Sequence, residues 1–249
     1  MRVRSWARLL VWPAVAAVYG AGASPAVAQS LPRFLLPGLA AVGAVVILWS
    51  FVAALARFRR GVRADRLLAL LLSAAALVFL VALPLTRLVR VLAGPPAGEP
   101  LVLARFNDWL GSEGFPRLSA HRGIDVVGRP GSDVLAAGDG RVVVARDTRD
   151  LCGLILILVH DPHGYRTIYC HFAELAVRVG DEVRRGQRIG ALGTTGQRAW
   201  PGYEHVHLEL QKDPEKSGGE DPLLRMVGCF EPSTRYATDR LVLTYPVRC

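Results

Sequence analysis

Long uninterrupted apolar runs fill the first third of the chain, and short β-like runs fill most of the rest. Residues 34–56 and about 67–85 contain no acidic or basic side chain. A helix needs about 20 such residues to span the hydrocarbon core of a bilayer. Neither run has a polar face, which argues against two helices buried in a soluble core. The pattern therefore predicts two transmembrane helices.

Arginines set the expected topology of these helices. Residues 57–66, between the two runs, hold five arginines, and basic loops stay in the cytoplasm. Both outer ends, and with them the rest of the chain, then lie outside the cytoplasm. Residues 1–28 have a basic start, an apolar centre and the small-residue pattern Ala26-Val27-Ala28. They predict a secretory signal peptide, with an uncleaved membrane helix as the alternative.

The β-like part of the chain begins after a helix-breaking segment, Gly94-Pro95-Pro96-Ala97-Gly98-Glu99-Pro100. The short runs that follow are bounded by Gly, Pro and Asp, which predicts a mainly β domain with an antiparallel sheet. Asp161-Pro162-His163-Gly164 predicts a hairpin turn. The expected strands are Ile124–Val127, Val134–Ala137, Arg141–Arg146, Leu154–His160, Tyr165–Phe172, Gln187–Leu192 and His205–Leu210.

The net charge of +9 is unevenly distributed along the chain. Residues 1–93 hold 11 arginines and a single acid, Asp65, so their formal charge is +10. Residues 94–249 hold 19 basic and 20 acidic side chains, a formal charge of −1. The β-like part therefore has no basic field to attract a phosphate backbone, and we exclude nucleic acid as a partner.

Four of the six histidines fall in three segments of the β-like part. His205 and His207 lie two apart in an expected strand, so both imidazoles point to the same face. His121 and Asp125 flank a glycine ahead of an apolar run, and His171 ends another expected strand. A catalytic zinc needs three N or O ligands and an open position for water, with groups nearby that exchange protons. This set supplies both.

The motifs and their order resemble the lysostaphin-like (LytM-type) zinc metallopeptidases, which cut bacterial cell-wall peptides. The resemblance covers roughly half of the chain, from about Arg117 to Leu224, and the combination of motifs is highly specific. The matching elements are His121-Arg122-Gly123-Ile124-Asp125, residues 131–142 with Asp139-Gly140, Tyr169-Cys170-His171-Phe172, residues 179–190, Gly193-Thr194-Thr195-Gly196 and His205-Val206-His207-Leu208-Glu209.

The resemblance implies a LytM-like duplicated hybrid, or barrel-sandwich, β fold with Zn²⁺ as cofactor. It implies His121, Asp125 and His207 as the zinc ligands. It implies His171 and His205 as the catalytic pair. One of the pair would act as general base on water, and the other would stabilise the oxyanion or help protonate the leaving amine. The sequence does not tell which histidine has which role.

One stretch departs from the family pattern. Eight residues, 197–204, separate Gly196 from His205, which is longer than the family usually shows. Trp200 and Tyr203 lie in this insert, where they either line the substrate groove or pack against their own loop. The tail after Leu224 has no family counterpart.

Four cysteines in an exported domain predict disulfides, with three possible pairings. Cys229 with Cys249 would clip the tail and is the preferred pair, which leaves Cys152 with Cys170. The second pair needs a bulge, because Cys170 is expected to lie opposite Ile155 on the neighbouring strand. The alternative pairings therefore stay open.

The other two histidines, His160 and His163, flank the expected hairpin turn. Turns run over the protein surface. We therefore expect both side chains at the surface and assign them no part in catalysis.

These inferences predict a membrane-anchored zinc metalloendopeptidase that hydrolyses peptide bonds in peptidoglycan stems or cross-links. It would be held by the lipid bilayer of the bacterial inner (cytoplasmic) membrane, with its catalytic domain on the periplasmic side. The expected divisions are a signal peptide (1–28), a membrane region (29–93), a linker leading into the domain (94–116), a zinc metallopeptidase domain (117–224) and a C-terminal tail (225–249).

Three alternatives accompany this prediction. A non-catalytic LytM-type module would bind cell wall or activate another hydrolase, but the complete set of ligands and catalytic histidines favours an enzyme. A protease of the same chemistry would act on a protein, which the motifs do not distinguish. A purely structural zinc site fits less well, because such sites usually have four protein ligands.

Overall fold

The computed structural model describes residues 94–109, 111, 117, 119–199, 204–212 and 219–249, together with the isolated residues 45, 49 and 52. The chain divides into two compact units, and the described strands lie in the unit of residues 90–113 and 117–249. The expected signal peptide and, apart from the three isolated residues, both expected transmembrane helices fall outside the described residues. Within the described part, no helix has the length and apolar character to cross a bilayer.

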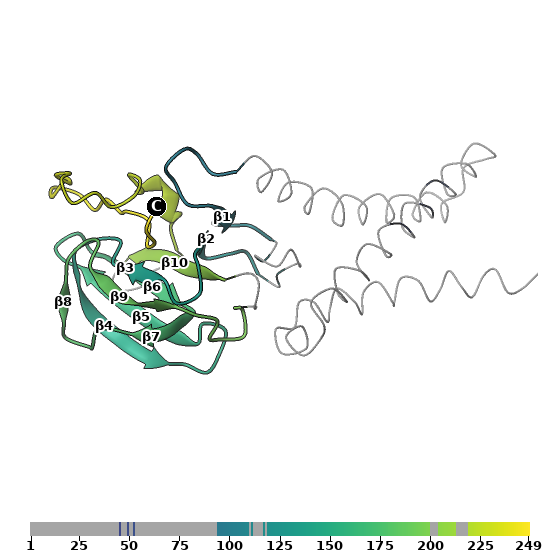
Figure 1. Ribbon diagram of the computed structural model, residues 1–249, viewed down its shortest axis with the longest axis horizontal. Helices are drawn as coiled ribbons and strands as arrows, with labels where there is room; N and C mark the ends of the chain where they lie inside the picture. Colours follow the sequence, from purple (N-terminus) through teal and green to yellow (C-terminus); the bar gives the residue numbers. More distant parts are fainter. Residues whose placement is uncertain are drawn as a thin grey trace, which may run out of the picture. The chain divides into compact units, whose positions relative to one another are not determined.

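The described strands form two antiparallel sheets (Figure 1). The larger sheet has the order β1-β2-β10-β6-β5-β4-β8, and the smaller has the order β3-β9-β7. The elements are β1 (Val102–Ala104), β2 (Gly123–Val127), β3 (Asp133–Leu135), β4 (Gly140–Asp147), β5 (Leu154–His160), β6 (Tyr165–Cys170), β7 (Phe172–Leu175), β8 (Glu182–Val183), β9 (Arg188–Leu192), β10 (His205–Lys212) and the 3₁₀ turn η2 (Pro222–Leu224).

The mainly β, antiparallel character predicted from the sequence is confirmed. β5 has the predicted bounds, and β6 follows it across the predicted hairpin turn. β2, β9 and β10 differ from prediction by one or two residues at one end, and β3 and β4 differ by one or two residues at both ends. The strand predicted over Tyr165–Phe172 is instead interrupted at His171, which separates β6 from β7. β1 was not predicted, and β8 was indicated only by the family resemblance of residues 179–190, because these short edge strands hold too few residues to show a period of two.

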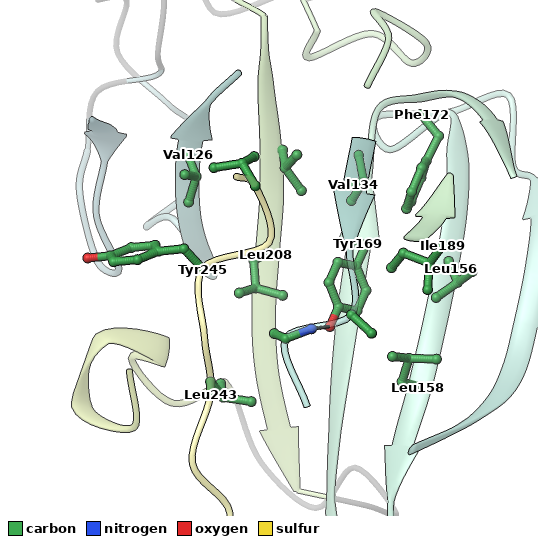
Figure 2. Packing of buried hydrophobic residues seen from close by; sticks show 14 of the residues in the cluster. Val126, Val134, Leu156, Leu158, Tyr169, Phe172, Ile189, Leu208, Leu243 and Tyr245 are labelled. Carbon is green, nitrogen blue, oxygen red and sulfur yellow. Dashed lines mark hydrogen bonds between the residues drawn. The ribbon is translucent and has the colours of Figure 1, made fainter. Parts of the chain in front are cut away.

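Side chains from both sheets make one buried cluster (Figure 2). On β10, Val206 and Leu208 are fully buried in it, as are Leu156 of β5 and Ile189 of β9. Burying such a side chain contributes roughly 1.5–3 kcal/mol. This packing determines the rotation of β10, so that its residues 205, 207 and 209 lie on the opposite face.

The C-terminal tail is part of the same core. Leu243 is fully buried, and Tyr245 lies in the same cluster (Figure 2). The Tyr245 hydroxyl donates a hydrogen bond to the Glu99 carboxylate at 2.9 Å, which ties the tail to the segment ahead of β1. A disulfide joins Cys229 to Cys249, confirming the preferred pairing.

The second disulfide joins Cys152 to Cys170, with Cα atoms 5.0 Å apart. Cys170 is the last residue of β6, and Cys152 lies in the turn ahead of β5. This turn brings the two residues together, so the pair does not need the bulge that the strand register alone required. No cysteine is free, which excludes a thiol nucleophile.

Candidate metal and catalytic site

Strand β10 carries two of the five predicted site residues, His205 and His207, and lies between β2 and β6. The other three predicted residues lie on these two strands or directly beside their ends. His207 pairs with Asp125 of β2 on one side and with Cys170 of β6 on the other. His171 follows β6 directly. Val206 and Leu208 of β10 are buried in the core, so His205 and His207 point to the other face of the sheet. Asp125, directly opposite His207 on β2, points to this same face.

Gly123 allows β2 to approach β10 closely. A Cβ atom at this position would lie 2.2 Å from the carbonyl oxygen of Leu208, so any side chain would force the two strands apart. The close pairing brings Asp125 beside His207. It also brings in His121, which lies just before β2 and is 2% exposed.

Three donor atoms converge at this point. Nε2 of His121 lies 3.1 Å from Oδ1 of Asp125 and 2.9 Å from Nδ1 of His207. Nδ1 of His207 lies 2.8 Å from Oδ1 of Asp125. A tetrahedral zinc with bonds of about 2.0–2.1 Å separates its ligand atoms by about 3.3 Å. The three residues therefore fit a zinc ion, and they form a candidate metal group among the described residues.

The remaining ring nitrogen of each ligand histidine pairs with an oxygen. Nδ1 of His121 donates to the backbone carbonyl of Arg105 at 3.0 Å. Nε2 of His207 lies 3.1 Å from Oε1 of Glu209. A carbonyl and an ionised carboxylate only accept hydrogen bonds, so each keeps a proton on the nitrogen that it contacts. The other nitrogen of each ring faces the ligand group and is the one available to a metal, which displaces any proton there.

Asp125 is buried among positive and polarisable groups. Its Oδ2 accepts a hydrogen bond from Nη2 of Arg117 at 3.0 Å, which leaves Oδ1 to the two ligand histidines. Burial alone would raise the pKa of Asp125. The neighbouring imidazoles of His121 and His205, and hydrogen bonds from His121 and His207, instead hold this pKa well below its usual range.

The two ligand histidines are shifted in opposite directions. Burial lowers the pKa of His121, and the nearby Asp125 offsets this only in part. Burial also acts to lower the pKa of His207, but hydrogen bonds to the carboxylates of Asp125 and Glu209 outweigh it and raise this pKa to about 9. The difference arises because His207 contacts two carboxylates and His121 contacts one.

His171 has a left-handed backbone, with φ at 72°, which is uncommon for a residue other than glycine. Three hydrogen bonds hold it there. Its N–H donates to the carbonyl of Cys152 at 3.0 Å, its carbonyl accepts from the N–H of Gly193 at 2.9 Å, and Nδ1 donates to the carbonyl of Thr195 at 2.9 Å. Such strained conformations cluster at functional sites, and this one turns the imidazole towards the other histidines.

His171 and His205 lie beside the ligand group. Their ring centroids are 5.0 Å apart in an edge-on arrangement, and Nε2 of His205 is 3.6 Å from Oδ1 of Asp125. Burial, with smaller contributions from His205 and His207, lowers the pKa of His171 to about 3. Its imidazole is therefore neutral near physiological pH, with a lone pair on Nε2.

All five predicted residues line one cavity of about 170 Å³. The cavity wall also includes Arg117, Arg122, Leu151, Arg198 and Glu209, together with the disulfide-bonded Cys152 and Cys170. A larger hollow of about 570 Å³ lies over β4 and β8, but none of the five residues lines it. The arrangement in the smaller cavity suits metal-assisted attack by water on a carbonyl, with two histidines placed to move protons.

The sequence prediction missed the residues that support the site. Arg117, Thr195 and Glu209 hold Asp125, His171 and His207 respectively. The two-residue spacing of β10 was a usable signal for Glu209, since it places residues 207 and 209 on one face. Trp200 and Tyr203, the predicted substrate-binding residues, lie outside the described residues.

The expectation that His160 lies at the surface was wrong. It is fully buried, because it continues the inward face of β5 that starts with Leu156 and Leu158. Nδ1 donates to the carbonyl of Asp139 at 2.6 Å, and Nε2 pairs with the Thr167 hydroxyl at 2.8 Å. Burial lowers the pKa of His160, and it does not line the site cavity.

Comparison with known proteins gives a family match over the same region. Residues 119–219 match Peptidase family M23. Peptidoglycan DD-endopeptidase ShyA of Vibrio cholerae serotype O1 is 37% identical over 94 residues, which are 38% of this chain and 21% of that protein. Murein hydrolase activator NlpD of Escherichia coli (strain K12) is 37% identical over 91 residues, 36% of this chain and 23% of that protein. The chain thus spans about a fifth of the length of the curated relatives that it matches.

Solved structures match a similar share of the chain. The catalytic domain of the antimicrobial peptidase lysostaphin from Staphylococcus simulans is 29% identical, with 43% of this chain and 78% of that chain covered and a TM-score of 0.39. A zinc containing peptidase from Vibrio cholerae is 27% identical, with 51% of this chain and 37% of that chain covered and a TM-score of 0.41.

Proposed function

Residues 119–219 form a peptidase family M23 domain, and on that premise we propose that the chain is a zinc metalloendopeptidase. The bonds it cuts are peptide bonds in bacterial peptidoglycan stems or cross-links. The observation that carries this proposal is the convergence of five side chains on one cavity. Three of them place donor atoms within 3.1 Å of one another. ShyA, named a peptidoglycan DD-endopeptidase, supports the choice of peptidoglycan.

The ligands and the catalytic pair divide the chemistry. His121, Asp125 and His207 would hold zinc, which when bound supplies Lewis acidity that lowers the pKa of water and polarises a carbonyl. His171 is the general base, because the Thr195 carbonyl holds the proton on Nδ1 and leaves Nε2 to accept one. His205 stabilises the developing oxyanion, and the proton that His171 has taken up passes to the leaving amine.

We also propose that the domain is displayed outside the cytoplasm from the bacterial inner membrane. The support is the pair of apolar runs, 34–56 and 67–85, and the five arginines between them. The lipid bilayer is then a partner of this chain. Protease protection in membrane vesicles tests the topology: a domain sealed on the cytoplasmic side would contradict it.

Trp200 and Tyr203 are proposed to contact substrate, since exposed aromatic side chains bind glycan and peptide through their flat apolar faces. Both lie in the long stretch between Gly196 and the strand that starts at His205. A Trp200→Ala variant is expected to raise KM for cell-wall fragments. Unchanged activity and substrate affinity would remove this assignment.

The experiment that tests the function is mass analysis of muropeptides released from isolated sacculi by the purified full-length chain. The expected result is new peptide fragments, whose masses name the bond cut, with release abolished by a zinc chelator and restored by added zinc. A His171→Ala variant is the matched control, because it keeps the three ligands. Release by this variant at the wild-type rate would contradict the proposed mechanism.

A non-catalytic activator of another cell-wall hydrolase is the second candidate. The similarity to murein hydrolase activator NlpD favours it, and the complete set of ligands and catalytic histidines weighs against it. The same assay separates the two. Zinc-loaded, folded protein that releases no fragment alone but increases release by a second cell-wall hydrolase would establish the activator.

A further inference from the structure

Strand β10 continues past the metal-ligand position with two more polar residues on the same face. His207, Glu209 and Gln211 follow one another at intervals of two, so their side chains lie in a row. The Glu209 side chain is 14% exposed, and its Oε1 lies 3.1 Å from Nε2 of His207. A carboxylate is seldom this buried without a specific partner, and the partner of Oε1 here is the imidazole of a proposed ligand.

Glu209 is itself held in place by its second oxygen. Nε2 of Gln211 donates to Oε2 at 2.8 Å, and Nε of Arg122 lies 3.7 Å from the same oxygen. The Gln211 amide and the Arg122 guanidinium therefore both contact Oε2. Oε1 is left to His207, so the carboxylate has one orientation rather than several.

The contact decides which nitrogen of His207 faces the ligand group. Nε2 is turned towards Oε1 of Glu209, and Nδ1 is turned towards Asp125 and His121, so Nδ1 is the nitrogen whose proton a metal would displace. Without this acceptor, the imidazole can take the other tautomer or rotate about its own axis. Either change removes Nδ1 from the ligand group.

We infer that Glu209 is a positioning residue that holds His207 in its metal-binding tautomer and orientation. This inference rests on the proposed zinc site. Outer partners of this kind typically change metal affinity by roughly 10- to 100-fold. Glu209 therefore acts on zinc retention through His207, not on the substrate.

Zinc affinity measured by competition with a chromophoric chelator tests this in the full-length chain. A Glu209→Ala variant is expected to bind zinc roughly 10- to 100-fold more weakly than wild type. Glu209→Gln, whose amide oxygen still accepts a hydrogen bond, is expected to recover part of this loss. Glu182→Gln is the matched control, since its side chain is 77% exposed on an edge strand outside the cavity, and it is expected to bind zinc as wild type does.

A second readout separates positioning from loss of fold. Imidazole ¹⁵N spectra of the zinc-loaded protein are expected to show His207 protonated at Nε2 in wild type, and mixed or weakened signals in Glu209→Gln. Wild-type zinc affinity in Glu209→Ala overturns the inference. A wild-type chain that binds zinc but cuts no sacculi removes the proposed peptidase and leaves this inference standing, whereas a wild-type chain that binds no zinc removes both.

Discussion

The backbone carbonyl of Cys152 accepts a hydrogen bond from the backbone N–H of His171 at 3.0 Å. The disulfide of Cys152 joins it to Cys170, the residue just before His171. The turn ahead of β5 therefore restrains the histidine assigned as general base through two contacts. One is the hydrogen bond to its backbone N–H, and the other is the disulfide to the residue before it. A covalent link supports the left-handed backbone that this position requires.

Replacing Cys152 and Cys170 by serine is expected to lower both stability and turnover. Loss of a disulfide that closes a loop of 18 residues costs about 3 kcal/mol of unfolding free energy. The loss of restraint at His171 lowers kcat in addition. Urea unfolding and muropeptide release measure the two effects.

The disulfide between Cys229 and Cys249 provides the control for that double variant. It closes a loop of similar length, with a separation of 20 residues, and neither cysteine lines the cavity. Its removal is expected to lower stability by a similar amount while kcat of the folded fraction stays near wild type. Equal loss of kcat in the two double variants would show that the first disulfide has no special link to catalysis.

Substituting the ligands and the catalytic pair is expected to separate zinc binding from turnover. His121→Ala and Asp125→Ala each remove a ligand atom, so the purified protein should retain little zinc. His171→Ala and His205→Ala should retain zinc while turnover falls roughly 10²- to 10⁴-fold, the usual contribution of a general acid or base. Metal content and fragment release on the same samples check this division, and loss of zinc from His171→Ala would contradict it.

Thr195 is expected to act on catalysis through the loop that holds His171. Its hydroxyl donates to the Phe172 carbonyl at 2.7 Å and accepts from the Leu154 N–H at 3.0 Å. Thr195→Val keeps the shape but leaves both groups unsatisfied, at a cost of about 1–3 kcal/mol. We expect lower stability and a lower kcat with KM nearly unchanged.

Thr195→Ser, which keeps the hydroxyl, is the matched variant for the loop. Its kcat should lie close to that of wild type. If the valine variant loses stability but turns over at the wild-type rate, the hydroxyl supports the fold and does not position His171.

Buried His160 is expected to make stability depend on pH. Burial lowers its pKa below the ordinary value of 6.5, so the unfolded chain binds a proton at a pH where the folded chain does not. The contribution of neutral His160 is fully present above about pH 6.5 and is lost as the pH falls towards the folded pKa. His160→Gln should therefore flatten the decline in unfolding free energy as the pH falls below about 6.5.

Urea unfolding of chelator-treated protein across this pH range measures the effect. Without metal, the site histidines contribute equally to the pH dependence of wild type and of His160→Gln. His163→Gln, in the neighbouring turn, is the control and should keep the wild-type slope. An identical dependence of unfolding free energy on pH in His160→Gln and wild type would mean that folding does not lower the pKa of His160.

Much of the fold was predictable because strand-forming composition and turn signals are local properties. The run Leu154–His160 is apolar up to its last residue and ends at a turn signal, and the structure has the same strand. The interruption at His171 was not predictable, since nothing in Tyr169-Cys170-His171-Phe172 breaks a strand. It depends on contacts with Cys152 and Thr195, which come from distant parts of the chain.

The sequence by itself determined the antiparallel β character, the strand face shared by His205 and His207, and the residue types that suit zinc, because spacing and chemistry are written into neighbouring residues. Tertiary structure decided which atoms meet. Register brought Asp125 opposite His207, and the tail packed against the core. These outcomes follow from packing between segments far apart in the chain, which no local pattern contains.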